Sequence, residues 1–279
     1  TAIRMATLNA AECFDLKDRG AIAPGYRGDV VLLDDLKDFH VNRVFVEGEL
    51  VAEEGKYLPE IKKCDIASVK GSVIVKDFSK EKFKMHLKSN KVNVIQILPG
   101  GVVTAKDIAE IELDANGEFV RNPEVDLVKV AVVERHQGTG NVACGFLKGY
   151  GIKEGAVALS VAHDSHNIIV VGVNDDEMEF AVNSLVEQEG GIVLVKEGKV
   201  IESMPMPIAG LMSDQSGEWV DQKLTDIHEK AYEELGICGE VEPVMTLCFM
   251  SLAVIPEIKL TDIGLFDVTT FSFIPVEAE

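Results

Sequence analysis

Two short polar segments in the second half of the chain carry the residue types that could do chemistry. The first is His163-Asp164-Ser165-His166-Asn167, which lies between two apolar runs. Two imidazoles, a carboxylate, a hydroxyl and an amide within five residues can bind a ligand or move a proton. Polar segments at the ends of apolar strands are common places for binding and catalytic groups, because a rigid scaffold positions them.

The segment His163–Asn167 allows three interpretations. Imidazoles and carboxylates are ligands of hydrolytic metals, and the segment offers three candidate ligands, with a fourth required from elsewhere. Alternatively, the Asp164 carboxylate could fix the tautomer of His163 for an acid–base role. The third interpretation is a hydrogen-bonded structural network at a domain or subunit contact. The sequence alone leaves the three open.

The second polar segment begins with Glu134-Arg135-His136, directly after a valine-rich run, and continues through Gly138 and Gly140. The glycines could let backbone amides approach an anion, but the lysine and serine of a phosphate loop are missing. Two interpretations remain: a polar turn whose glycines adopt positive φ, or a shared polar pocket. The candidate pocket residues of the two segments are therefore Glu134, Arg135, His136, His163, Asp164, Ser165, His166 and Asn167.

The sequence around these two polar segments predicts a mixture of strands and helices. Polar residues at 174–176 favour the start of a helix, and Gly190-Gly191 favours its end. Such a mixture predicts a layered α/β (α+β mixed) domain. We expect strands at 92–98, 126–134, 156–162 and 168–173, a hairpin over 192–203, and helices over 175–189 and 219–235.

Residues 1–65 predict a helix followed by short strands. Thr1–Phe14 has the apolar spacing of a helix interior, without a capping residue ahead of it. Val30–Leu33 is a continuous apolar run that predicts a buried strand, and Glu47-Gly48 predicts a tight hairpin. We expect three parts, at 1–19, 20–65 and 66–279.

Charge and composition exclude several classes of function. The chain of 279 residues has 47 acidic against 27 basic residues and a net charge of −20, which repels nucleic acids and anionic membrane surfaces. Its longest apolar run, Val244–Ile255, is shorter than the roughly 20 residues that cross a bilayer. The five cysteines are odd in number and scattered, which argues against a disulfide framework or a zinc knuckle. A reducing cytoplasm fits this pattern.

A family resemblance adds to these observations. The stretch Gly20-Ala21-Ile22-Ala23-Pro24-Gly25-Tyr26-Arg27-Gly28-Asp29 resembles the motif G-x-I-x-P-G-x-x-A-D of the amidohydrolase superfamily, with Gly28 in place of the usual alanine. In that superfamily the motif follows the last helix of a (β/α)8 barrel and enters a small β-domain. The resemblance implies that residues 1–19 are that last helix and that residues 20–65 form the small β-domain and a linker.

The remainder of the chain resembles the C-terminal domain of the bacterial and archaeal adenine deaminase family. The residues that carry this resemblance are Val132–His136, Gly138–Asn141, Ser160–Asn167, Pro207–Ser213, Leu260–Asp262 and Gly264-Leu265. The resemblance implies hydrolysis of adenine to hypoxanthine and ammonia in purine salvage. It also implies divalent metals (manganese, iron or zinc) at the mouth of the barrel, and a homo-oligomer.

In that family the metal ligands precede the helix with which this chain opens, so none maps onto a residue here. We therefore expect the chain to be a C-terminal portion that holds no metal, is inactive alone, and associates with the missing N-terminal portion or with its own copies. Two alternatives stay open. One is a non-catalytic oligomerisation or scaffolding domain, and the other is an independent metal-dependent hydrolase with its site at His163–Asn167.

Overall fold

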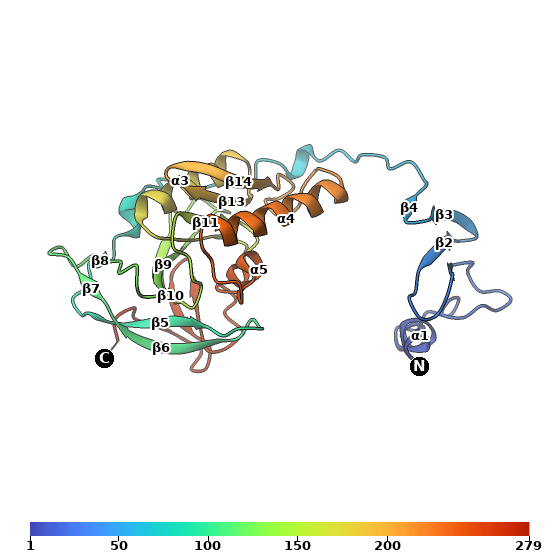
Figure 1. The fold of residues 1–279 in the computed structure, drawn as a ribbon, viewed down its shortest axis with the longest axis horizontal. Coiled ribbons are helices and arrows are strands. Elements are labelled where there is room, and N and C mark those ends of the chain that lie inside the picture. The colour runs from blue at the N-terminus through green and yellow to red at the C-terminus, as the bar shows by residue number, and fades with distance from the viewer. Residues whose placement is uncertain (279) are drawn as a thin grey trace. The chain divides into compact units, whose positions relative to one another are not determined.

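The structure of the protein is a computed structural model that describes residues 1–278. The chain divides into two compact units, residues 1–65 and 66–279, which are both drawn in Figure 1. The smaller unit begins with one continuous helical segment, as the apolar spacing predicts. It consists of α1 (Ala2–Arg4), a π-helical turn η1 (Met5–Asn9) and α2 (Ala10–Cys13).

An antiparallel four-stranded sheet follows in the smaller unit. Its strands, in spatial order, are β1 (Val30–Leu33), β2 (Val41–Val46), β3 (Glu49–Glu53) and β4 (Lys56–Tyr57). The predicted hairpin is confirmed, since β2 pairs with β3 across Glu47 and Gly48. Both turn residues have positive φ, 54° and 84°, which matches the right-handed twist of a tight hairpin.

The smaller unit buries little of its apolar surface. Ala11 is its one buried apolar residue among those the structure describes, whereas Ile22 is 90% exposed. The prediction that Val30–Leu33 is a buried strand is wrong for this chain, because Val31 and Leu32 are exposed. A short helix and four short strands supply too few apolar neighbours to cover both faces of a sheet.

The larger unit is built on a sheet of eight strands. Their spatial order is β14-β13-β11-β12-β9-β10-β5-β6, and every pairing is antiparallel except that of β5 with β10. The strands are β5 (Lys91–Ile97), β6 (Thr104–Glu110), β9 (Leu127–Val133), β10 (Val142–Lys148), β11 (Ala156–Leu159), β12 (Ile168–Gly172), β13 (Gly191–Lys196) and β14 (Lys199–Pro205).

Strand β9 lies inside this sheet, and all seven of its residues are buried. Its last residue, Val133, pairs with Ile168 of β12 on one side and with Val142 of β10 on the other. The end of β9 therefore lies beside the beginning of β12. Lys129 is buried within β9 because its Nζ donates to Asp175 at 2.7 Å and to the Phe83 carbonyl at 3.0 Å.

Helices cover both faces of the sheet, so the larger unit has helix–sheet–helix layers (Figure 1). On one face lies α3 (Asp175–Glu187), capped by the Asn174 side chain, which accepts a hydrogen bond from Glu177 N at 2.8 Å. On the other face lie α4 (Gly217–Glu233) and α5 (Pro243–Cys248), whose apolar side chains share one core with those of β9, β11 and β12.

A small third sheet joins the same core as α4 and α5. It consists of β15 (Ile258–Thr261), β16 (Gly264–Asp267) and β17 (Ser272–Ile274). Two short strands, β7 (Glu112–Leu113) and β8 (Phe119–Val120), pair with each other, and single turns of 3₁₀ helix lie at η2 (Ala67–Val69) and η3 (Lys80–Phe83).

The predicted mixed α/β fold is confirmed, and each strand and helix expected between residues 92 and 235 is present, with ends that differ by a few residues. The pattern missed β6, β10, α5 and the third sheet. Within residues 1–278, the structure contains no helix with the length and apolarity that a membrane span needs.

Candidate functional site

The fold brings the two polar segments of the sequence together. Because β9 and β12 are antiparallel neighbours, the residues after β9 meet the residues before β12 at one end of the sheet. Arg135 N donates to Asn167 Oδ1 at 3.3 Å, and Arg135 Nε donates to the His166 carbonyl at 2.5 Å. His136 Nε2 lies 2.7 Å from the Ser165 carbonyl oxygen. The two segments therefore form one polar cluster.

Arg135 extends this cluster to a third segment. Its side chain is buried, with the residue 1% exposed, and one terminal nitrogen donates to the Ala209 carbonyl at 3.2 Å. The other terminal nitrogen lies against Gly210. A side chain at position 210 would place its Cβ atom 2.7 Å from this nitrogen, so only glycine leaves room for it. That nitrogen has no hydrogen-bond partner within residues 1–278. Burial lowers the pKa of Arg135 while the charge of Glu134 opposes the shift, and a guanidinium stays charged at neutral pH.

Glu134 turns toward its own loop. Its carboxylate accepts hydrogen bonds from the backbone N–H groups of His136, Gln137 and Thr139, at 2.5, 2.8 and 2.9 Å. The Thr139 hydroxyl adds a fourth hydrogen bond at 3.1 Å. Burial alone raises the pKa of Glu134, but these hydrogen bonds outweigh it and lower the pKa to about 2. Glu134 thus fixes the loop in which Gly138 and Gly140 adopt positive φ.

His163 is held by the last residue of α5 and by the segment that follows it. Its backbone N–H donates to the Cys248 carbonyl at 2.9 Å, and its carbonyl accepts from Ser251 Oγ at 3.1 Å. The His163 ring packs against the Phe249 ring, with centroids 4.8 Å apart, and against the His166 ring at 5.4 Å. Within residues 1–278, no ion pair or hydrogen bond joins His163 to Asp164, whose side chain is exposed.

His166 is the group in the cluster best suited to act on a ligand. Its backbone has a φ of 53°, and its Nδ1 atom is buried without a hydrogen-bond partner in the part of the chain that the structure describes. Burial lowers the pKa of His166, and the neighbouring His163 and Arg135 add to the shift, so the ring is neutral at pH 7. A neutral imidazole can accept a proton or a hydrogen bond.

The cluster does not fit a divalent metal. Among the described residues, no group of three or more His, Cys, Asp or Glu side chains is placed to hold an ion. His163 and His166 lie near each other, but the Asp164 side chain points to solvent and Glu134 is engaged by its loop. The donor set therefore lacks the three protein ligands of a hydrolytic metal site.

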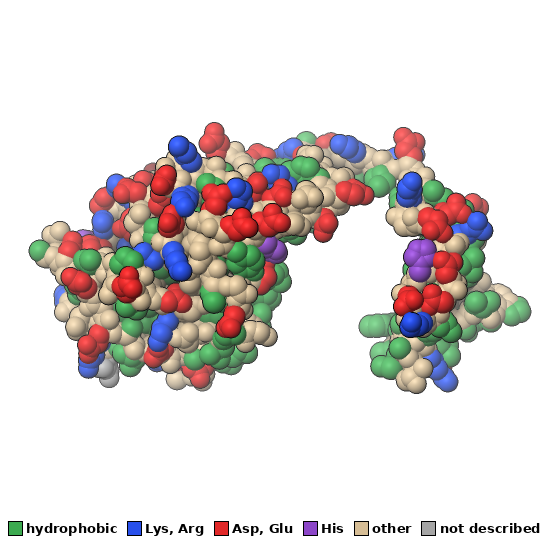
Figure 2. Space-filling model, in the orientation of Figure 1, with side chains coloured by type: hydrophobic (Ala, Val, Ile, Leu, Met, Phe, Trp, Pro, Cys, Tyr) green, Lys and Arg blue, Asp and Glu red, His purple; other side chains and the backbone are tan. Residues whose placement is uncertain are grey.

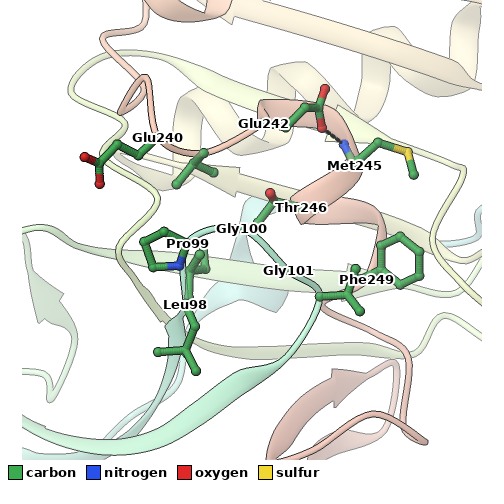
Figure 3. Close-up of a pocket in the computed structure, with 12 residues that line it drawn as sticks. Leu98, Pro99, Gly100, Gly101, Glu240, Glu242, Met245, Thr246 and Phe249 are labelled. Atoms are coloured by element: carbon green, nitrogen blue, oxygen red, sulfur yellow. Dashed lines mark hydrogen bonds between the residues drawn. The ribbon is translucent and has the colours of Figure 1, made fainter.

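A cavity of about 210 Å³ lies between α5 and the turn that follows β5. The turn Pro99-Gly100-Gly101 and the residues Met245 and Phe249 are among those that line it, as Figure 3 shows. Phe249 lines this cavity and also packs against His163, so it connects the cavity to the polar cluster. Met245 and Phe249 belong to the apolar run Val244–Ile255 of the sequence. Only folding brings this segment beside a turn far away in the chain.

The hydrogen bonds of Glu134 make the stability of the larger unit depend on pH. We expect Glu134→Gln to lower the free energy of unfolding by about 3 kcal/mol at pH 7, because the native pKa lies near 2 and the unfolded pKa near 4.5. The stabilisation is complete above pH 4.5 and is lost as the pH falls toward 2. Denaturant unfolding across this range measures it. The exposed Glu110→Gln variant serves as the control: it keeps Glu134 and should follow the pH dependence of the unchanged chain, whereas Glu134→Gln should lose that dependence. Equal curves for both variants would contradict the assignment.

Two family models match the chain. The model described as the adenine deaminase C-terminal domain matches residues 101–272, which is more than half of the chain. The model described as the amidohydrolase family matches residues 1–51, which lie in the smaller unit.

Curated relatives match across almost the whole chain. It is 65% identical over 277 residues to adenine deaminase 2 of Desulfotalea psychrophila, a match that covers 99% of this chain and 48% of the relative. It is 49% identical to an adenine deaminase of Ligilactobacillus salivarius, with 100% of this chain and 48% of the relative covered. The chain thus spans about half the length of these relatives, and it belongs to the adenine deaminase C-terminal domain family.

Proposed function

We propose that this chain serves, as the C-terminal portion of an adenine deaminase, in the hydrolysis of adenine to hypoxanthine and ammonia in purine salvage. The observation that carries the proposal is the match of almost the whole chain to proteins named adenine deaminase, at 65% and 49% identity. The match covers 48% of those relatives, so the activity belongs to a longer enzyme of which this chain supplies one part.

The resemblance to amidohydrolases implies divalent metal, and we propose manganese, iron or zinc for the whole enzyme. Such a metal, when bound, would activate the water that replaces the amino group of adenine, which leaves as ammonia. Because the described residues do not fit a metal site, we assign the ligands to the part of the enzyme outside this chain.

The polar cluster would contribute binding and proton transfer. Arg135 holds the backbone of the His166 segment and of the Ala209 turn, so it fixes the position of the His166 ring. The neutral His166 ring could then accept a hydrogen bond or a proton from a ligand. His163 and Asn167 position the segment from either side, through Phe249 and Arg135.

The exposed apolar surface of the smaller unit supports association with the rest of the enzyme. Ile22, Phe14 and Tyr57 are largely exposed, and both faces of the four-stranded sheet carry exposed apolar residues. A surface of this kind marks a protein contact. We propose that the remainder of the enzyme covers it, within a cytoplasmic homo-oligomer. The cytoplasmic location is supported by the five cysteines, which are all free.

One prediction of this proposal concerns turnover. The purified chain, supplied with manganese, iron or zinc, should release no ammonia from adenine. Coexpression with the part of the Desulfotalea psychrophila relative that the chain does not match should restore release, because the two parts together complete the enzyme. An ammonia assay on both preparations tests this. Equal turnover by the chain alone, or no turnover by the complex, would contradict the proposal.

Another prediction separates a role of His166 in the reaction from a role in scaffolding. In the restored enzyme, His166→Asn should lower kcat at least tenfold without loss of thermal stability, because asparagine tolerates the φ of 53° but has no imidazole. His86→Asn is a matched control, since His86 has a φ of 48° and an exposed side chain. Unchanged kcat in His166→Asn, or loss of assembly instead of turnover, would favour the scaffolding alternative.

A further inference from the structure

A buried hydroxyl group fixes the turn that lies against Arg135, the Gly210 turn (residues 207–213). Ser160 follows β11 directly and is fully buried, whereas Figure 2 shows charged side chains over much of one face of the larger unit. The Ser160 Oγ atom donates a hydrogen bond to the Gly210 carbonyl at 2.6 Å and accepts one from the backbone N–H of Gly191 at 2.7 Å. One hydroxyl group therefore ties the Gly210 turn to the first residue of β13.

Two glycines let the Gly210 turn pack closely between Ser160 and Arg135. A Cβ atom at Gly190 would lie 2.7 Å from the Gly210 Cα atom and 2.9 Å from Ser160 Oγ. On its other side the turn contacts the guanidinium, since a Cβ atom at Gly210 would lie 2.9 Å from the Arg135 Cζ atom. Because close-packed groups transmit displacements, a shift of the turn on the Ser160 side also moves its contact with Arg135.

The segment that enters the larger unit holds the same turn and the same arginine. The backbone N–H of Ala209 donates to the Val69 carbonyl at 2.8 Å, and the backbone N–H of Ile74 donates to the Arg135 carbonyl at 2.8 Å. Ala209 is thus fixed through its N–H group, while its carbonyl accepts from the guanidinium at 3.2 Å. Ser160 adds a second anchor at the next residue of the turn.

Removal of the Ser160 hydroxyl would take away the partner of two buried backbone groups, the Gly210 carbonyl and the Gly191 N–H. Buried backbone groups without partners are costly, so the turn would shift until water or another group replaces the hydroxyl. The neighbouring Ala209 carbonyl would move with the turn. Arg135 would then lose one of the two carbonyl groups that hold its guanidinium.

We propose that Ser160 is a positioning residue for His166, which acts through the Gly210 turn and the Arg135 guanidinium. Three contacts connect the two residues: Ser160 Oγ to the Gly210 carbonyl, the turn to the guanidinium, and Arg135 Nε to the His166 carbonyl at 2.5 Å. The proposal deepens the proposed function, on which it rests only for its kinetic test. The position of the His166 ring is measured without turnover.

NMR titration of the His166 ring in the 279-residue chain tests the proposal. In the unchanged chain, burial and the nearby His163 and Arg135 hold the pKa of His166 below its ordinary value. Ser160→Ala should expose the ring to water, so the pKa of His166 should rise toward about 6.5.

Thr104→Val is the matched control for Ser160→Ala. The Thr104 hydroxyl is also buried and also donates to a backbone carbonyl, that of Ile258 at 3.0 Å, but it belongs to β6 at the edge of the sheet. Its loss should leave the His166 titration unchanged. An unchanged titration in folded Ser160→Ala, or an equal change in Thr104→Val, would overturn the proposal.

Gly210→Ala makes the same test from the turn, and it serves where Ser160→Ala does not fold. The added methyl group would lie 2.7 Å from a guanidinium nitrogen, so it should displace Arg135 and raise the pKa of His166 in the same direction. Gly198→Ala is its control, because Gly198 has a similar φ, 67° against 71°, but open space around a Cβ atom. If folded Gly210→Ala titrates like Gly198→Ala, the turn does not position His166.

The kinetic test uses the restored enzyme. Ser160→Ala should lower kcat by about fivefold or more, whereas Thr104→Val should leave kcat unchanged even where it lowers the melting temperature equally. Losses of kcat that follow the melting temperature in both variants would show a purely structural role and contradict the proposal.

The two proposals can fail separately. A raised pKa of His166 in Ser160→Ala, together with an inactive restored enzyme, would support the role of Ser160 and contradict the proposed deaminase. An unchanged titration, together with full activity of the restored enzyme, would support the deaminase and contradict the role of Ser160.

Discussion

The candidate site depends on one buried cation. Arg135 is the second residue after β9, a strand in the middle of the sheet, and its guanidinium binds the carbonyl groups of His166 and Ala209. A buried charge without a bonded carboxylate costs stability unless hydrogen bonds compensate it, so these carbonyls cannot move away freely. The position of the His166 ring, and with it the chemistry proposed for the cluster, follows from this arrangement.

The sequence predicted what local patterns encode. The apolar runs at 127–133 and 168–172 identified two strands, and the Asn174 cap identified the start of α3. The polar residues at 134–136 and 163–167 were correctly seen as strand ends, but only the antiparallel pairing of β9 with β12 shows that they meet. The alternative that Glu134 faces a ligand could not be weighed from sequence, because its hydrogen bonds to its own loop depend on the fold.

Other features of the fold could not be predicted from the pattern of neighbouring residues. Strand β10 contains a glycine and a cysteine, and its pairing depends on β9 and β5, which are separate in the chain. Phe249 lies in an apolar run of the sequence, and only the fold shows that it contacts His163 and also lines a cavity together with residues from another part of the chain. In the smaller unit, the apolar run Val30–Leu33 predicted burial that the described residues do not provide. A pattern of this kind indicates that a surface should be covered, and not what covers it.

Hydrogen exchange of the Arg135→Met variant, compared with the unchanged chain, tests the central claim most directly. Methionine keeps much of the apolar stem but removes the donors that hold the two carbonyl groups. The account predicts that exchange in segments 163–167 and 207–213 increases together, by at least tenfold, while α3 remains protected. Unchanged protection of both segments in a folded variant would contradict it, because the guanidinium would then not be what holds the site.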